Sequence, residues 1–160
     1  MKNIKFNLSV VILSMLSSFS YATQNQLPVC VSKHYGGATI AANDIDLIAP
    51  DIAENGAVVG VGIDEIKSIP KGRFVQEVSF YNEFREEPVA KFFLSEQMLS
   101  TNLKTRIRLR ESSSLYAVAK LDNGQLLGGK SFIKVTIGGC GGGGGGSAGM
   151  ISSSKKVCGD

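Results

Sequence analysis

The chain has 160 residues, and its formal net charge of +3 falls to +1 if Lys2 and Lys5 leave with a signal peptide. This length suits one domain, and the nearly balanced charge gives no reason to expect nucleic acid or an anionic membrane as a partner. His34 is the single histidine, so neither a Ser-His-Asp arrangement nor a metal site is supported. We therefore expect no metal and no cofactor, and we interpret His34 as an exposed loop residue.

The first 22 residues are typical of a secretory signal peptide. Lys2 and Lys5 precede an apolar stretch, residues 6–19, which is too short and too rich in serine to cross a bilayer. Small residues at Ser20 and Ala22 then suit a signal peptidase. The sequence lacks a twin-arginine pair, so we expect export by the general secretory route and a periplasmic protein that begins near Thr23.

The mature chain is predicted to open with an irregular arm over residues 23–43, which show no helical period. From residue 44 onward, short apolar and polar alternations are separated by turn signals, which is the pattern of strands. Gly128 and Gly129 predict a bulge in the last strand, which follows an Asp122-Asn123-Gly124 hairpin turn. The expected strands are 44–48, 57–63, 73–81, 89–94, 103–110, 115–121 and 126–137.

About seven evenly spaced strands without a helix of ordinary length predict an all-β fold. We expect an immunoglobulin-like antiparallel β-sandwich over residues 44–137. Because there is no tryptophan, the Cys…Trp…Cys signature of antibody domains is missing.

A glycine-rich segment follows the last strand. Cys140 lies between Gly138-Gly139 and a run of six glycines that begins with Gly141 and Gly142. Glycine loses the most conformational entropy when it is ordered, so the segment is predicted to be a flexible tether. We expect residues 138–160 to form a Gly-rich swinging arm and tail, with disorder after Gly146.

Three cysteines in an exported chain leave at least one thiol outside any internal disulfide. The sequence allows a bond between Cys30 and Cys158, which would leave Cys140 as the thiol. It equally allows a redox pair of Cys140 and Cys158. Connectivity cannot be assigned from sequence alone.

Arg106, Arg108 and Arg110 would lie on one face of their strand. They are interpreted either as a solvated face or as a docking surface for an acidic patch on a partner. Glu86 and Glu87, beside Arg85, are interpreted as solvent-exposed.

Four segments carry a family resemblance: Asp51-Ile-Ala-Glu-Asn-Gly-Ala-Val-Val59, Thr105-Arg-Ile-Arg-Leu109, Ala117-Val-Ala119 and Lys134-Val-Thr-Ile-Gly-Gly-Cys-Gly-Gly142. Over residues 44–142 the chain resembles the SoxY family, the sulfur carrier subunit of the periplasmic thiosulfate-oxidising (Sox) system. The resemblance implies an immunoglobulin-like sandwich that pairs with a SoxZ-like β-protein.

The resemblance also implies a carrier rather than an enzyme. Cys140 would bind a thiosulfate-derived sulfur adduct covalently, and Gly138, Gly139, Gly141 and Gly142 would form the arm. Other Sox enzymes would act on the bound sulfur in sequence, release sulfate and regenerate the thiol. Two other functions stay open: a periplasmic β-sandwich binding module, and a thiol redox protein that uses Cys140 and Cys158.

The chain departs from the family pattern in its tail. Members of the family usually end at the glycine that corresponds to Gly142, whereas this sequence continues for eighteen residues and adds Cys158. We expect the longer tail to alter how the arm enters a partner, and Cys158 to be able to cap Cys140.

Overall fold

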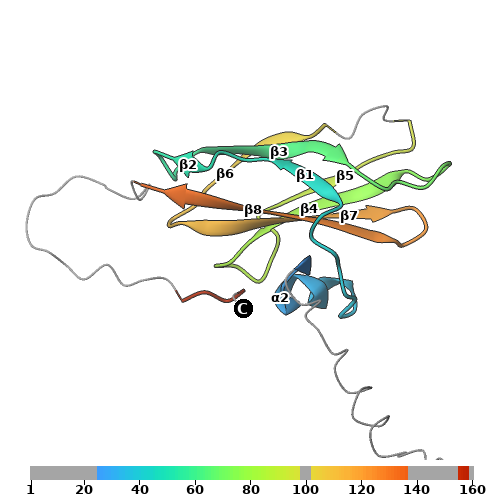
Figure 1. Cartoon of the computed structure of the whole chain (residues 1–160), viewed down its shortest axis with the longest axis horizontal. Coiled ribbons are helices and arrows are strands. Elements are labelled where there is room, and N and C mark those ends of the chain that lie inside the picture. Colours follow the sequence, from blue (N-terminus) through green and yellow to red (C-terminus); the bar gives the residue numbers. More distant parts are fainter. Residues whose placement is uncertain (1–24, 98–101, 137–154, 159–160) are drawn as a thin grey trace, which may run out of the picture.

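The computed structural model describes residues 25–97, 102–136 and 155–158, and it is almost entirely β (Figure 1). Two sheets face each other: three strands in the order β1-β3-β6 and five in the order β2-β8-β7-β4-β5. The strands are β1 (Ile45–Ile48), β2 (Ile52–Ala53), β3 (Val59–Ile66), β4 (Val75–Asn82), β5 (Ala90–Phe93), β6 (Lys104–Ile107), β7 (Ser113–Leu121) and β8 (Leu126–Val135). The predicted all-β sandwich is confirmed, and each of the seven expected strands is present.

The eighth strand, β2, lies between the first two expected strands, where the sequence predicted no strand. It pairs in parallel with the end of β8, so the sheet is mixed rather than wholly antiparallel. The carbonyl oxygens of Asp51 and Ala53 accept hydrogen bonds from the amides of Lys134 (2.9 Å) and Thr136 (3.1 Å). A two-residue strand is too short for alternation to reveal it, yet it fixes the last stretch of backbone before the glycine-rich segment.

Strand β7 is the centre of the molecule, because it is buried on both faces over most of its length. Leu115 and Ala117 face the core between the two sheets, whereas Tyr116 and Val118 face a second apolar cluster on the outer side. Fully buried strands lose the polar half of the alternation, which explains why the sequence of β7 is nearly continuous in apolar residues.

The N-terminal arm contains two short helices that the sequence did not indicate. It contains the helix α2 (Val29–Ser32) and the 3₁₀ helix η2 (Lys33–Tyr35), and α2 lies against the outer face of the five-stranded sheet (Figure 1). Val31 and Ile40 are buried there with Tyr81. The sequence indicated no helix in this arm, because a four-residue helix is too short to show a helical period.

The bulge predicted at Gly128-Gly129 is not present. The pairing of β7 with β8 runs through both glycines without a shift of register. A Cβ atom at Gly128 would collide with the carbonyl oxygen of Ala41, and one at Gly129 with that of Ile45. These glycines therefore allow the end of the N-terminal arm and the start of β1 to pass close to β8, which is the other common reason for glycine inside a strand.

The C-terminal residues 155–158 are docked on the body, beside α2 (Figure 1). The backbone amides of Val157 and Cys158 both donate to the carbonyl oxygen of Glu83, at 2.8 and 2.9 Å. The prediction of disorder is thus wrong for this end of the tail. Among the described helices, none is long and apolar enough to span a bilayer.

Candidate functional site

Cys140 and its flanking glycines, Gly138, Gly139, Gly141 and Gly142, lie outside the described residues. The structure instead describes the two points that bound their segment. The chain enters it after Thr136, at the end of β8, and returns at Lys155. The chemistry available to Cys140 on this body is therefore set by what surrounds these two anchors.

The first anchor is fixed by several elements at one edge of the sandwich. The amide of Val135 donates to the hydroxyl of Ser112 (3.0 Å) in the segment before β7, and Thr136 is bonded to Ala53 of β2. Gly56 lies between this strand end and Leu109: its carbonyl accepts from the Leu109 amide, and a Cβ on Gly56 would meet Val135. The segment with Cys140 thus leaves the sandwich next to the connection between β6 and β7.

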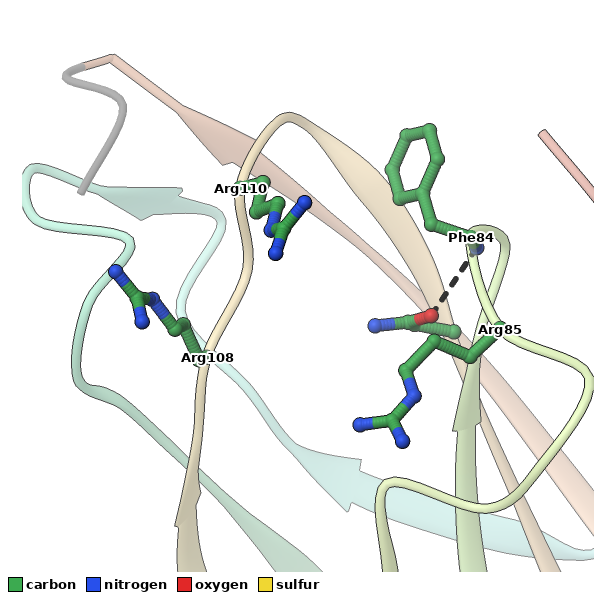
Figure 2. A pocket seen from close by; sticks show the side chains of 5 residues that line it. Phe84, Arg85, Arg108 and Arg110 are labelled. Carbon is green, nitrogen blue, oxygen red and sulfur yellow. Dashed lines mark hydrogen bonds between the residues drawn. The ribbon is translucent and has the colours of Figure 1, made fainter. Parts of the chain in front are cut away.

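That connection forms one wall of a pocket of about 470 Å³. Arg108 and Arg110 line it from this side, and the other side comes from the end of β4 and the loop after it (Figure 2). The lining residues are Asn82, Phe84, Arg85, Arg108 and Arg110. The pocket is therefore lined by three arginines from two separate loops.

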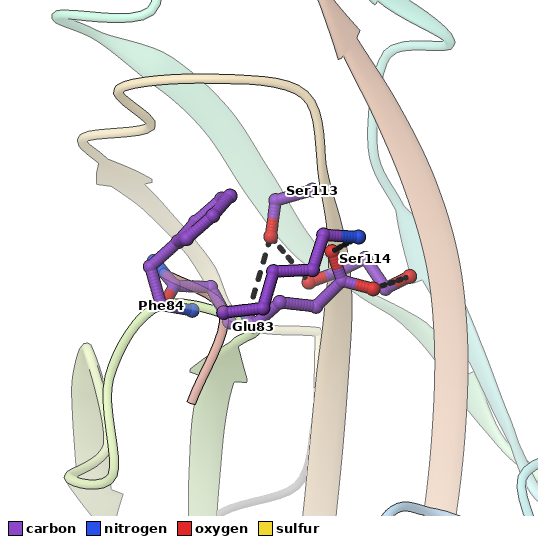
Figure 3. A network of polar contacts seen from close by, with 6 residues as sticks. Glu83, Phe84, Ser113 and Ser114 are labelled. Atoms are coloured by element: carbon purple, nitrogen blue, oxygen red, sulfur yellow. Dashed lines mark hydrogen bonds and ion pairs between the residues drawn. The ribbon is translucent and has the colours of Figure 1, made fainter. Parts of the chain in front are cut away.

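The second anchor is Glu83, which lies in the same loop as Phe84 and Arg85. Its side chain is 9% exposed and pairs with Lys156 Nζ at 2.8 Å, and the hydroxyl of Ser114 donates to its other oxygen at 2.8 Å (Figure 3). Burial alone would raise the pKa of Glu83, but the hydrogen bonds from Lys156 and Ser114 outweigh it and hold the pKa below its usual value. The charged carboxylate therefore fastens residues 155–158 to the body.

A disulfide joins Cys158 to Cys30 of α2, with Cα atoms 5.5 Å apart. This is one of the two pairings that the sequence left open. It crosslinks the docked tail to the N-terminal arm and leaves Cys140 as the only cysteine outside the bond. A thiol is a nucleophile in its deprotonated form, so the chain retains one group capable of covalent chemistry.

The profile of the family described as sulfur oxidation protein SoxY matches residues 31–140. The chain belongs to the SoxY family. The match covers well over half of the sequence, includes the sandwich with both walls of the pocket, and ends at Cys140. The recognition made from the four sequence segments is thereby confirmed.

One similar solved structure comes from the same family. The sulfur carrier protein SoxY from Chlorobium limicola f thiosulfatophilum is similar, with 28% identity, a TM-score of 0.52, and coverage of 67% of this chain and 93% of that one. The superoxide reductase (neelaredoxin) from Ignicoccus hospitalis is 17% identical with a TM-score of 0.48, covering 58% of this chain and 80% of that one. No curated protein matches.

The arginine row of this SoxY-family chain does not lie on one strand face. Strand β6 ends at Ile107, so only Arg106 belongs to it, and that side chain is exposed outside the pocket. Arg108 and Arg110 follow in the connection and line the pocket. The row therefore divides into one surface residue and two pocket residues.

His34 and the acidic residues do not assemble a metal site in the part of the chain that the structure describes. His34 is exposed in η2, where its Nε2 lies 2.7 Å from the carbonyl oxygen of Glu86. Its ring centroid is 5.4 Å from that of Tyr81. These contacts hold the loop after β4 against the N-terminal arm.

Sequence reasoning missed the residues of the loop after β4. Asn82, Glu83 and Phe84 carried no motif, and Arg85 was treated as part of an exposed charged loop. Glu83 is in fact buried. A buried carboxylate is rare unless it is paired, but its partners Lys156 and Ser114 are distant in sequence. No local signal could have revealed them.

Proposed function

We propose that this protein is a non-catalytic covalent carrier of sulfur intermediates in thiosulfate oxidation. Cys140 would hold the intermediate, and the Sox enzymes would act on it in turn. The observation that carries the proposal is the family match, which extends through the sandwich to Cys140. The 28% identical protein of similar structure is itself a sulfur carrier.

The loading step can be written for a single thiol. A Cys140 thiol and one thiosulfate dianion join through a new sulfur–sulfur bond, giving a Cys–S–S–SO₃⁻ adduct, one proton and two electrons. Both joined sulfurs are oxidised, so a partner redox protein must accept the electrons. This chain itself does not have to accept the two electrons. The step is therefore consistent with a carrier whose partners perform the catalysis.

The Cys30–Cys158 disulfide supports this use of Cys140. Because Cys158 is already bonded to Cys30, the alternative redox pair of Cys140 and Cys158 would first require disulfide exchange. In an oxidising compartment, a disulfide that uses the other two cysteines keeps the third from forming an internal bond. The binding-module alternative assigns no role to Cys140.

The proposal includes the compartment and the partners. A signal peptide over residues 1–22 would deliver the chain to the periplasm through the general secretory route. There it would pair with a SoxZ-like β-protein and meet the other Sox enzymes after export. Glycines on both sides of Cys140 would let the loaded cysteine enter narrow active sites, since they add no side-chain bulk.

The test is intact-mass spectrometry of the purified mature protein after exposure to thiosulfate and the cognate Sox proteins. We expect a gain of one thiosulfate unit, localised to Cys140 by peptide mapping, and no gain in Cys140→Ser. The carrier role is refuted if Cys140→Ser gains the same mass or supports undiminished thiosulfate consumption. A loss of two hydrogens with a Cys140–Cys158 peptide would favour the redox pair instead.

A further inference from the structure

The pocket between the two loops has the composition of an anion site. Figure 2 shows the guanidinium groups of Arg85 and Arg110 directed into the space between the loop after β4 and the connection before β7. The guanidinium of Arg108 is turned toward the outer side of that connection (Figure 2). Two arginines from different loops therefore face a common space, with a third at its rim.

The lining offers hydrogen-bond donors and lacks a carboxylate. Asn82 is buried, and its Oδ1 accepts from the Phe84 amide at 3.1 Å, so its amide nitrogen is left as the donating end. Within the described part of the chain, Arg85 and Arg110 form no ion pair with a carboxylate. Guanidinium forks bind oxoanions through paired N–H groups.

The buried carboxylate of the loop after β4, that of Glu83, is not among the lining residues and holds the two walls together. Glu83 pairs with Lys156 at 2.8 Å. It also accepts a hydrogen bond from the hydroxyl of Ser114, which Figure 3 shows beside it. Its backbone amide also donates to the hydroxyl of Ser113 at 3.2 Å. The loop that carries Arg85 is thus bonded to the strand that follows Arg110, so the two arginine-bearing walls are held in place before any ligand arrives.

The pocket also lies between the two anchors of the Cys140 segment. Ser112, two residues after Arg110, bonds the amide of Val135 at the end of β8. On the other side, the returning chain bonds Glu83, and the sulfur of Cys158 lies 3.9 Å from the carbonyl oxygen of Arg85. Cys140 is four residues beyond Thr136, a span of up to about 14 Å. Because Ser112 bonds the residue before Thr136, a tether of that length reaches the wall that carries Arg110.

We infer that this pocket binds a tetrahedral sulfur oxoanion, and that its source is the sulfonate end of an adduct carried on Cys140. The inference rests on the proposed carrier function for that source. A volume of about 470 Å³ accommodates such a group together with neighbouring glycine backbone. The pocket would hold the loaded cysteine against the body between visits to partner enzymes.

The binding site itself is tested on the full mature chain with Cys140→Ser and the disulfide intact. The probe is sodium sulfate against sodium chloride at matched ionic strength, followed by amide chemical shifts. We expect saturable shifts at Phe84, Arg85 and Arg110 with sulfate alone. Arg110→Gln should weaken sulfate binding about tenfold or more.

Arg106→Gln is the matched control, because it removes the same charge from an exposed position on β6 outside the pocket. It should change sulfate binding little, since exposed charges act weakly at a distance in salt. The site is overturned if sulfate does not saturate, or if Arg106→Gln and Arg110→Gln weaken binding equally. Thermal melting of each variant verifies that it is folded.

The source is tested by loading Cys140 chemically in the chain with all three cysteines. Tetrathionate transfers a thiosulfonate to a thiolate: the Cys140 sulfur bonds to an inner sulfur, the central S–S bond breaks, and thiosulfate leaves. The loaded protein should show the sulfate-induced shifts at Arg85 and Arg110 without added sulfate, and should bind sulfate at least severalfold more weakly. Protein capped at Cys140 with iodoacetamide, which adds a neutral group, should show no such shifts and should bind sulfate with unchanged affinity.

Equal sulfate binding by loaded and capped protein would overturn the Cys140 source and leave a site for a free oxoanion. Neither experiment uses Sox enzymes, so a failure here is distinct from a failure of the carrier function. Conversely, if Cys140 never loads with the full system, the sulfate titration still decides whether the arginine pocket binds oxoanions.

Discussion

Removing the disulfide should destabilise the whole protein, because the bond closes a loop that contains both sheets. Cys30 and Cys158 are 128 residues apart. The chain-entropy relation gives about 5 kcal/mol for a loop of that length, and measured values usually fall short of it. We therefore expect Cys30→Ser/Cys158→Ser to lower the free energy of unfolding by about 3 kcal/mol. For a domain of this size that is a fall in Tm on the order of 10 °C.

The comparison is made in a Cys140→Ser background, so that no thiol remains to exchange. Guanidinium denaturation and thermal melting followed by circular dichroism give the two quantities, and hydrogen exchange at Val157 reports the docking of the tail. A loss below about 1 kcal/mol, with Val157 still protected, would refute the reasoning. It would mean that Glu83 alone holds residues 155–158 and that the bond constrains the unfolded chain little.

The remaining predictions concern the anchor, the crossing glycine and the arm. Glu83→Gln should remove the ion pair with Lys156 and cost about 1 kcal/mol, seen as faster hydrogen exchange in residues 155–158. Because the pKa of Glu83 is lowered on folding, its contribution is present above the usual value of 4.5 and is lost as pH falls below it. Parent stability should therefore decline more steeply with acid than that of Glu83→Gln, and parallel pH profiles would contradict this. Gly129→Ala should cost about 1–3 kcal/mol by collision with a crossing backbone, whereas Gly60→Ala, with open space around it, should stay within about 0.5 kcal/mol in denaturant titrations. Gly139→Val should slow turnover with the complete Sox system while leaving melting nearly unchanged; a large loss of Tm would assign that glycine a structural role.

The strands were predictable because the burial of one sheet face produces alternation over several residues. Residues 73–81 and 103–110 alternate clearly, and the structure places most of β4 and all of β6 within them. The hairpin turn at Gly124 was also predictable, because its sequence signal is local. Gly124 has a positive φ of 85°, which the Asn-Gly pair of such a turn readily adopts. Secondary structure set by neighbouring residues is thus available from the sequence.

The features that were missed depend on contacts between distant residues. The docking of Val157 requires the Glu83 carbonyl, and the close crossing at Gly128 requires the Ala41 backbone. The pocket exists because two loops converge, one with Arg85 and one with Arg110. The loop with Arg85 has no recognisable motif. The row of Arg106, Arg108 and Arg110 was open to two interpretations, a solvated face and a docking surface, because the sequence does not show which residues lie near each arginine in space.

The docked tail changes the physical description of the arm that carries Cys140. With Cys158 bonded to Cys30, the segment is held at both ends rather than trailing from one. Cys140 is four residues from Thr136 and fifteen from Lys155, so full extension allows about 14 Å from the first anchor and about 50 Å from the second. The end of β8 therefore limits how far the thiol can travel, and the disulfide does not shorten its reach. The disulfide instead changes the shape of the segment. If the protein acts as the proposed carrier, an enzyme that takes up Cys140 would have to admit a loop with two lengths of chain instead of a single chain end. The glycines that follow Cys140 have no side chains, so they keep the returning stretch of this loop as narrow as possible. This is a physical reason for glycine at these positions when both ends of the segment are fixed.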